Sequence, residues 1–240
     1  MKYIKPLYQI LFLITLACYS TLSFAGLVLE STRVIYPAGE SEVTLRMNNT
    51  GKLPVLAQSW IDHGDETVAP DQLSSVFVLT PPINRVNGGK GQTLRISMMD
   101  SSKLPKDKES VYYLNVLAIP TKSADGMNNN QLNIAFKTRI KLFYRPDGLQ
   151  GSANKAPELL KWSVSGNGVK ASNPTPYYIT ISKVVYSVGA TKYEAAGQMI
   201  APGGASEFHF KGLNQVSSTS AISYSTVNDF GGFNNHKIAK

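Results

Sequence analysis

Apolar and basic side chains alternate along residues 130–146, a pattern that suits a strand able to hold another protein chain. The mostly apolar set stands at every second position: Leu132, Ile134, Phe136, Thr138, Ile140, Leu142 and Tyr144. The positions between them include the bases Lys137, Arg139, Lys141 and Arg145. A strand places alternate side chains on opposite faces, so we predict a strand with one apolar face and one basic face. Such a strand can offer a partner a backbone edge and a row of apolar side chains.

The length of this alternation separates it from an ordinary core strand. Strands usually run for about five or six residues, whereas the alternation here extends from 132 to 144. We therefore expect part of the strand to serve a partner. The alternative is that its apolar side chains point into their own domain.

Residues that could carry catalytic or metal chemistry are sparse. His63, His209 and His236 stand far apart, without metal-ligand spacing and without a cysteine partner. The sequence has no Gly-x-Ser-x-Gly elbow, no phosphate-binding loop and no dinucleotide fingerprint. We therefore expect no enzyme activity, no catalytic residue, no metal site and no cofactor.

Residues 1–25 have the pattern of a secretory signal peptide. Basic residues precede an apolar run over 7–16, and small residues follow it, which fits a cut after Ala25. No later segment approaches about 18 consecutive apolar residues. We expect an exported, soluble protein without stable membrane insertion. Cleavage before Cys18, as in a lipoprotein, is the alternative for this segment.

Charge and cysteine content limit the partners. The sequence carries a formal net charge of +8, and loss of residues 1–25 would leave +6 and no cysteine, because Cys18 is the only one. No basic run of five or more residues occurs, and an exported chain rarely meets nucleic acid. We expect no nucleic-acid partner and assign most of the charge to solvated surface.

Short strands punctuated by turn residues fill two regions of the chain. Residues 146–157 interrupt them with a stretch rich in Gly, Pro and small polar residues, which is typical of linkers. Without any 12-residue helical stripe, the pattern predicts an all-β protein of two sandwich domains. The expected limits are 1–25 for the signal peptide, 26–148 for the N-terminal domain, 149–157 for the linker and 158–240 for the C-terminal domain.

The expected strands are given by their ranges. Those before the linker cover 26–36, 41–48, 53–62, 76–80, 93–98, 111–119 and the long alternating strand. Those after it cover 160–165, 169–172, 177–188, 207–210 and 221–227.

An ordered set of motifs carries a family resemblance. The first are Ser31-Thr32-Arg33, Leu56-Ala57-Gln58-Ser59-Trp60, Thr80-Pro81-Pro82 with Arg85, Leu104-Pro105 with Glu109-Ser110, and Tyr112-Tyr113-Leu114-Asn115 before Ile119-Pro120. The later ones are Ile140-Lys141-Leu142-Phe143-Tyr144-Arg145-Pro146, Asn173-Pro174-Thr175-Pro176-Tyr177-Tyr178 and Asn228-Asp229-Phe230-Gly231-Gly232. In this order the chain resembles the PapD-like periplasmic chaperones of the chaperone–usher pilus pathway over residues 26–232.

The resemblance implies two immunoglobulin-like sandwiches at an angle, with a cleft between them. It also implies that the long strand is lent to a pilin subunit that lacks a strand of its own. Such a subunit exposes an apolar groove and an unpaired edge, both of which promote aggregation. Leu132, Ile134 and Phe136 would be the apolar plugs that fill this groove.

By the same resemblance, Arg33 and Lys141 would hold the terminal carboxylate of the pilin. A carboxylate accepts charge-assisted hydrogen bonds from both side chains, and fixing it also fixes the register of the donated strand. The alternative is two solvated surface bases. Counting by two places Lys141 on the face opposite Phe136, and a bulge or strong twist could bring the two roles together.

The resemblance also implies an ion-pair network between the domains, formed by Glu109, Arg145 and Asp229. Arg145 offers five donors in a planar fork, enough to engage a carboxylate from each domain. We expect the network to set the interdomain angle rather than to add much stability. The alternative is three unconnected surface charges.

Two features bear on the subclass. The turn-rich stretch over 121–130 is short and no cysteine pair flanks the donated strand, which resembles the short-loop subclass that assembles rod-forming pili. Many relatives end with a disulfide-closed strand pair that this chain lacks, so the resemblance leaves its last strand open.

The predicted function is a periplasmic chaperone that binds, folds and caps fimbrial subunits by donor-strand complementation and delivers them to an outer-membrane usher. The alternative is a secreted β-sandwich binding module or a fimbrial structural subunit. Trp60 and Trp162 lie within strand patterns and are expected in the core, which argues against a sugar-binding surface. A self-capping dimer through the apolar row is a further hypothesis for the free protein.

Overall fold

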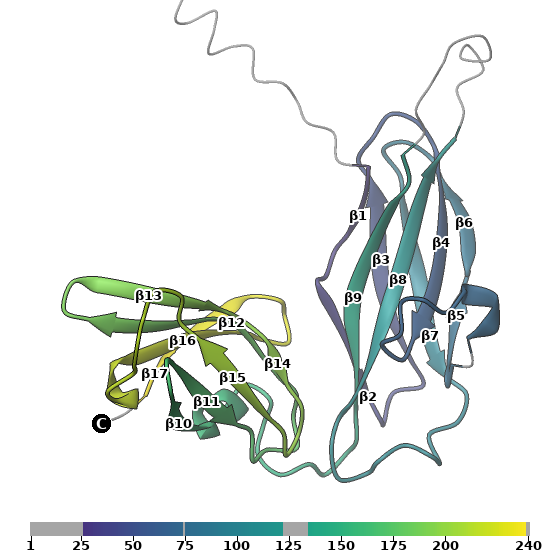
Figure 1. Ribbon diagram of the computed structural model, residues 1–240. Coiled ribbons are helices and arrows are strands. Elements are labelled where there is room, and N and C mark those ends of the chain that lie inside the picture. The colour runs from purple at the N-terminus through teal and green to yellow at the C-terminus, as the bar shows by residue number, and fades with distance from the viewer. Residues whose placement is uncertain (1–25, 74, 122–133, 239–240) are drawn as a thin grey trace, which may run out of the picture.

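The computed structural model describes residues 26–73, 75–121 and 134–238, which form two β-sandwich domains (Figure 1). The predicted all-β architecture of two domains is therefore confirmed. The predicted signal peptide and Leu132 lie outside the described residues. The helical segments within them are η1 (Pro70–Gln72), η3 (Ala156–Leu159) and η4 (Thr219–Ala221). None of these is long and apolar enough to cross a membrane.

The N-terminal domain consists of two packed sheets. Its strands are β1 (Leu27–Leu29), β2 (Arg33–Pro37), β3 (Glu42–Asn49), β4 (Val55–Asp62), β5 (Phe77–Thr80), β6 (Ile83–Val86), β7 (Gly91–Met98), β8 (Ser110–Pro120) and β9 (Phe136–Arg145). One sheet has the order β1–β3–β7–β5 and the other has the order β2–β9–β8–β4–β6. β2 pairs with β9 in parallel, whereas β8 pairs with β9 antiparallel.

The predicted strand over 26–36 is split between the two sheets. β1 pairs with β3 in one sheet, and β2 pairs with β9 in the other. The chain crosses over at Ser31, whose hydroxyl donates to the carbonyl of Arg33 at 2.6 Å. This crossing closes one side of the sandwich and leaves only part of β9 in contact with β2.

Alternation along the strands builds the first core. Ile140 and Leu142 of β9 are buried in this core, as the two-residue period predicts. The expectation for Trp60 was wrong: it is only half-buried, because Ser59 and Ile61 on either side of it occupy the inward positions of β4.

The C-terminal domain is a second sandwich with its own core. Its strands are β10 (Lys161–Ser165), β11 (Gly168–Ser172), β12 (Ile179–Val188), β13 (Thr191–Ala196), β14 (Met199–Ile200), β15 (Ala205–His209), β16 (Ile222–Val227) and β17 (Phe233–Lys237). One sheet is β10–β11–β15; the other is β13–β12–β16–β17, with β14 also on β12. Trp162 packs against this core, next to Phe208 and Tyr224.

The last strand forms without a disulfide. β17 pairs with β16 in continuous register from Ser223–Lys237 to Val227–Phe233. Side-chain hydrogen bonds reinforce the pair, including Ser225 Oγ to Asn235 Oδ1 at 2.6 Å. Neither β13 nor β17 was predicted, because both carry polar residues on the face that is turned to solvent.

The segment expected as a linker, residues 149–157, packs against the second domain. Ala156 is buried in the second core, and Leu149 and Ala153 pack on it. Tyr177 donates its hydroxyl proton to the carbonyl oxygen of Gly151 at 3.2 Å. The connection is therefore held in place on the C-terminal domain rather than free in solvent.

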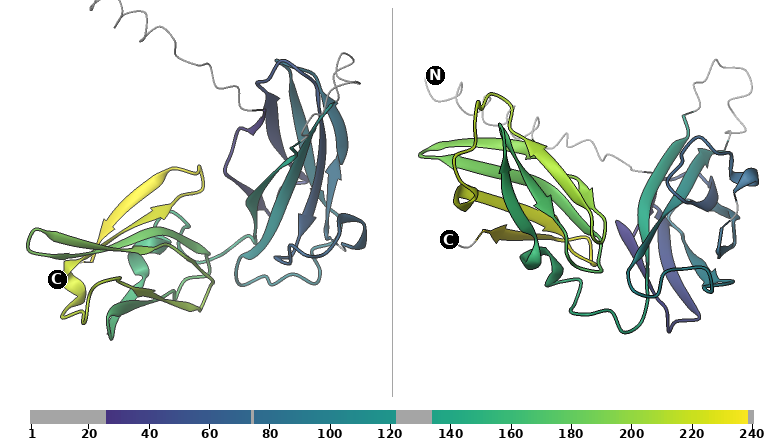
Figure 2. Two further views of the ribbon diagram at one scale, coloured as in Figure 1. Left: turned by 45° about the horizontal axis from the view of Figure 1, so that its top comes forward. Right: turned by 60° about the horizontal axis from the view of Figure 1, so that its bottom comes forward.

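The two domains stand at an angle to one another, and the hairpin of β16 and β17 reaches toward the N-terminal domain (Figure 2). Contacts between them are polar near the connection. The backbone N–H of Glu109 donates to the carbonyl of Pro176 at 2.9 Å, and Arg33 Nη1 donates to the carbonyl of Val227 at 3.1 Å.

Candidate functional site

The N-terminal half of β9 has one free edge. β8 pairs with β9 from Phe136 to Tyr144. On the other side, β2 pairs with β9 only from Lys141 onward, where Lys141 faces Arg33. Within the described residues, Phe136–Ile140 therefore have unpaired backbone groups along one side, which is where another strand can bind.

The apolar row continues beyond the domain's own core. Ile134 is 51% exposed and Phe136 is 68% exposed, whereas Ile140 on the same face is buried. Phe136 lines an apolar recess of about 510 Å³ between the sheets, with Leu27 and Val116 among its other walls. The row thus leaves the sandwich with its apolar side chains in solvent; the third predicted plug, Leu132, lies outside the described residues.

The register of β9 excludes a bulge between Phe136 and Lys141. The pairing with β8 advances one residue at a time over this whole stretch. Phe136, of the apolar row, and Lys141, of the basic pair, therefore lie on opposite faces of one strand, as strict alternation requires.

Arg33 and Lys141 are cross-strand neighbours at the point where the free edge of β9 ends and its pairing with β2 begins. They share a cavity of about 260 Å³, whose walls also include Thr32, Tyr113 and Arg139. The cavity is large enough for a carboxylate and a few atoms of its chain.

Arg33 is held between the two domains. Its guanidinium lies over the ring of Phe143 at 5.6 Å and donates to the carbonyl of Val227. Burial lowers its pKa, and the charges of Asp229 and Glu109 oppose this only in part. Its Nε is buried without a hydrogen-bond partner among the described residues. An anion at this point would complete the hydrogen bonding.

Lys141 is a cation without a counter-ion. Burial lowers its pKa, and the positive charges of Arg33 and Arg139 lower it further. No carboxylate of the described residues lies within ion-pair distance of its ammonium group. An incoming carboxylate would relieve both repulsions, so the electrostatics favour binding an anion.

Arg139 faces the same cavity but is already neutralised. Its Nη2 donates to Asp62 at 2.7 Å, its Nη1 lies 2.9 Å from Glu66, and its guanidinium lies 4.1 Å from the ring centre of Tyr113. Asp62 is buried and also accepts from the amide of Asn115 at 2.6 Å. Arg139 is therefore part of the cavity wall, whereas Lys141 and Arg33 have no carboxylate of the described residues at ion-pair distance.

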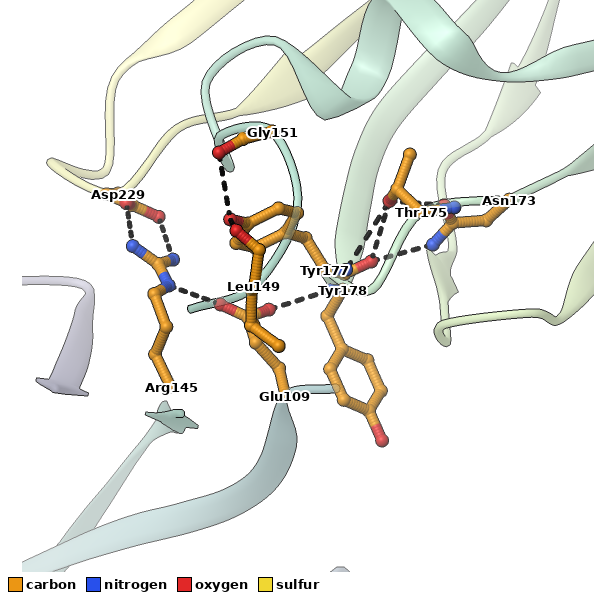
Figure 3. Close-up of polar contacts among 9 residues, drawn as sticks. All are labelled: Glu109, Arg145, Leu149, Gly151, Asn173, Thr175, Tyr177, Tyr178 and Asp229. Atoms are coloured by element: carbon orange, nitrogen blue, oxygen red, sulfur yellow. Dashed lines mark hydrogen bonds and ion pairs between the residues drawn. The ribbon is translucent and has the colours of Figure 1, made fainter. Parts of the chain in front are cut away.

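The structure brings Glu109, Arg145 and Asp229 together at the domain junction (Figure 3). Arg145 Nε donates to Glu109 at 2.6 Å, and its two terminal nitrogens donate to Asp229 at 2.8 and 3.1 Å. Although burial lowers the pKa of Arg145, the hydrogen bonds and charges of Asp229 and Glu109 raise it above the ordinary value. One fork thus joins carboxylates from both domains.

The loop before β12 fixes the far side of this network. The amide of Asn173 donates to the carbonyl of Tyr177 at 2.7 Å, and its oxygen accepts from the backbone N–H of Thr175 at 3.0 Å. This arrangement aims the backbone N–H of Tyr178 at Glu109, 2.7 Å away (Figure 3). Glu109 is therefore bound by Arg145 and by the backbone of the other domain.

Comparisons with known proteins agree with this geometry. The family model described as "Pili and flagellar-assembly chaperone, PapD N-terminal domain" matches residues 26–150. The model described as "Pili assembly chaperone PapD, C-terminal domain" matches residues 155–238. The chain belongs to the PapD-like family of pilus assembly chaperones. The role of this family is chaperoning rather than enzymatic.

Individual relatives cover nearly the whole chaperone. "Probable fimbrial chaperone YadV" of Escherichia coli K12 is 40% identical, over 91% of this chain and 92% of its own. "Chaperone protein FimB/FhaD" of Bordetella pertussis is also 40% identical, over 93% and 92%. The crystal structure of the YadV chaperone superposes with a TM-score of 0.75 at 38% identity, over 89% of this chain and 100% of that one.

One similar structure contains a second protein. It is described as the Salmonella enterica SafA pilin in complex with the SafB chaperone. It matches this chaperone with a TM-score of 0.72 and 27% identity, over 91% of this chain and 99% of that one.

The support around the cation pair could not be predicted from the sequence. Asp62 and Arg139 lie 77 residues apart, and no sequence spacing indicates that they meet. Arg139 was visible as a base in the alternating strand, but not as one whose charge is neutralised. The described residues hold no group of three or more His, Cys, Asp or Glu placed for a metal ion.

Proposed function

We propose that this protein is a periplasmic chaperone that binds one fimbrial subunit, its client, through the free edge of β9. The observation that carries the proposal is the coincidence of two features. The free edge ends at the position where Arg33 and Lys141 lie side by side, and no carboxylate of the residues that the structure describes lies at ion-pair distance from either. A terminal carboxylate supplies both the missing charge and the end of a strand.

The direction of the client strand follows from this anchor. A strand whose carboxyl end lies at Lys141 and whose body pairs with Phe136–Ile140 must run parallel to β9. β2 is also parallel to β9 and begins opposite Lys141. The client strand would therefore continue the line of β2 and complete the pairing of β9 on its open side.

The apolar row gives the client its missing core. Ile134 and Phe136 are exposed and stand two residues apart. Ile134 precedes β9, and if the client extends the strand to it, both side chains would enter the same side of an incomplete sandwich. Leu132 continues this period along the sequence. Binding would supply main-chain hydrogen bonds and apolar plugs together, and no nucleotide or other cofactor is needed for it.

The network of Glu109, Arg145 and Asp229 would keep the cleft at a fixed angle. Its bonds are short and tie together both domains. The carboxylate cavity also depends on this angle, because Arg33 is bonded to the C-terminal domain at Val227.

Several finer assignments belong to the same proposal. We infer that the signal peptide is cut after Ala25 and that the complex passes its client to an outer-membrane usher. We also infer the domain limits given above and the short-loop subclass. Its loop over 121–130 lies, apart from Thr121, outside the described residues. The binding-module alternative is not favoured, since the relatives named above are called chaperones.

A pull-down from the periplasm of the native cell tests the proposal. The tagged protein and its Lys141→Ala variant are compared, with Lys183→Ala, an exposed lysine on the C-terminal domain, as the matched control. We expect the wild type and the control to retain a fimbrial subunit in equal stoichiometry, and Lys141→Ala to lose it. Equal retention by Lys141→Ala would refute the anchor.

A further inference from the structure

The turn between β16 and β17 carries an aromatic side chain that the fold does not use. Phe230 is 87% exposed, the highest value among the large apolar side chains that the structure describes. Phe233, at the start of β17, is 69% exposed. Neither belongs to a core cluster, so both rings are available to a partner.

The turn is held rigidly. The side-chain oxygen of Asn228 accepts from the backbone N–H groups of Phe230 at 3.1 Å and Gly232 at 3.0 Å. The backbone N–H of Asn228 in turn donates to the carbonyl of Gly232 at 2.9 Å. Gly231 has a φ of +82°, a conformation that favours glycine. Phe230 therefore stands on a fixed base.

The same turn lies against residues that line the cavity of Arg33 and Lys141. Val227, just before it, accepts from Arg33, and Asp229 within it pairs with Arg145. A Cβ at Gly231 would clash with Oγ1 of Thr32, which lines the cavity. In both views of Figure 2 this hairpin reaches toward the N-terminal domain.

We propose that Phe230 is a client-contact residue, which packs on an apolar side chain close to the carboxyl terminus of the bound fimbrial subunit. The inference rests on the proposed function, because the carboxylate in the cavity brings the last client residues past the turn. Continuity with that anchor selects the client as the occupant. A ring on a rigid base loses little entropy on binding, and aromatic side chains are frequent energetic centres of interfaces.

The experiment measures how fast the client leaves. The fimbrial subunit identified by the pull-down is co-expressed with each chaperone variant, and its release is followed by exchange onto excess tagged wild-type chaperone. We expect Phe230→Ala to accelerate release about tenfold. Phe230→Leu should restore most of the retention, because it keeps an apolar side chain at this position. Val188→Ala, an exposed apolar site at the end of β12 in the C-terminal domain, should leave the rate unchanged.

The controls separate this inference from the proposed function. If Lys141→Ala forms no complex while Phe230→Ala releases the client within about twofold of the wild-type rate, the inference on Phe230 fails and the anchor stands. If Lys141→Ala retains the client normally, both fail. Faster release from Phe230→Ala together with a changed small-angle scattering profile would assign Phe230 a structural role and overturn the contact.

Discussion

Arg33 and Lys141 face each other at the position where β9 gains its second neighbour. Two positive charges thus meet at the foot of a free strand edge, while the nearby Arg139 and Arg145 have carboxylate partners. Bringing two cations together without a direct ion pair to either costs free energy in the unbound protein, and an anion reduces that cost. The pair is therefore poised for a ligand rather than for stability.

Removing either cation should strongly weaken client retention without unfolding the protein. We expect Arg33→Ala and Lys141→Ala each to weaken binding by a factor corresponding to about 1.5–3 kcal/mol, the usual value of a hydrogen bond to a charged group. Thermal unfolding and the yield of the two complexes provide the measurement. Unaltered yields from both variants would remove the carboxylate assignment.

As the pH is raised, client affinity should begin to fall at a lower pH than the ordinary pKa of a lysine would give. Burial, Arg33 and Arg139 lower the pKa of Lys141 in the free protein, and a bound carboxylate favours the charged form. Affinity is therefore retained below the free-protein pKa and lost as the pH rises through it. Titration of binding against pH checks this, and Lys141→Arg, whose charge persists, should move the loss to higher pH.

The same shift has the opposite effect on folding. The folded protein releases the Lys141 proton at a lower pH than the unfolded chain does. Between these two values the unfolded chain holds more protons, so this group makes the free energy of unfolding rise with pH. A difference curve against Lys141→Met isolates the contribution, and a decline over that interval would contradict it.

A charge on the plug row should block binding alone. Ile134→Asp would bury an unpaired carboxylate in the client groove, which is strongly unfavourable. Ile134 is half-exposed in the free protein, so we expect folding stability to change by no more than about 0.5 kcal/mol. Val78→Asp, on the outer β5, is the matched control. Normal client binding by Ile134→Asp would mean that the row does not enter the client.

Removal of each of the two carboxylates at the domain junction should have a different effect on the protein. Glu109 is buried and Asp229 is partly exposed. Glu109→Ala leaves Arg145 Nε and the backbone N–H of Tyr178 without their carboxylate partner, and we expect a loss of about 3 kcal/mol in urea unfolding. Asp229→Ala should cost about 1 kcal/mol but broaden the interdomain angle seen by small-angle scattering. Equal, small effects would indicate that the network does not orient the domains.

Glu42→Ala is the control for the junction. It breaks an ion pair of similar length with Arg95 on the solvent face, where such pairs contribute about 0–1 kcal/mol. It should therefore alter neither stability nor scattering appreciably.

Self-capping should depend on the same apolar row. If a second copy covers the free edge, sedimentation equilibrium of the wild type will show a dimer at high concentration, and Ile134→Asp will stay monomeric. A wild-type monomer throughout the accessible range would count against the dimer.

The local sequence pattern was sufficient to predict a strand whose two faces differ in polarity. The alternation predicted β9 from Phe136 onward and opposite faces for Phe136 and Lys141, because the period of a strand fixes both. The expected strand began at Leu132, whereas β9 begins at Phe136, and Ile134 precedes it. The possible bulge was settled only by the register with β8, since a bulge depends on the pairing partner and not on the strand alone.

Features that depend on distant pairing were missed. The break at Ser31 arises from a change of sheet, and β6 forms because residues 83–86 pair with β4 directly after a turn. The support of Arg139 by Asp62 likewise joins separate strands. Each needs a partner that no local window contains, whereas the family motifs placed Glu109 and Arg145 without explaining how Tyr178 completes their site.

The start of β2 at Arg33 gives the free edge a fixed lower end. A strand lying along β9 can slide no further than this point, because the chaperone's own chain occupies the next position. The last residue of a client subunit would therefore set the register of its whole bound strand, whatever the total length of the subunit. A subunit that lacks its final residues would offer the wrong side chains to every plug, so the edge would also distinguish complete chains from truncated ones.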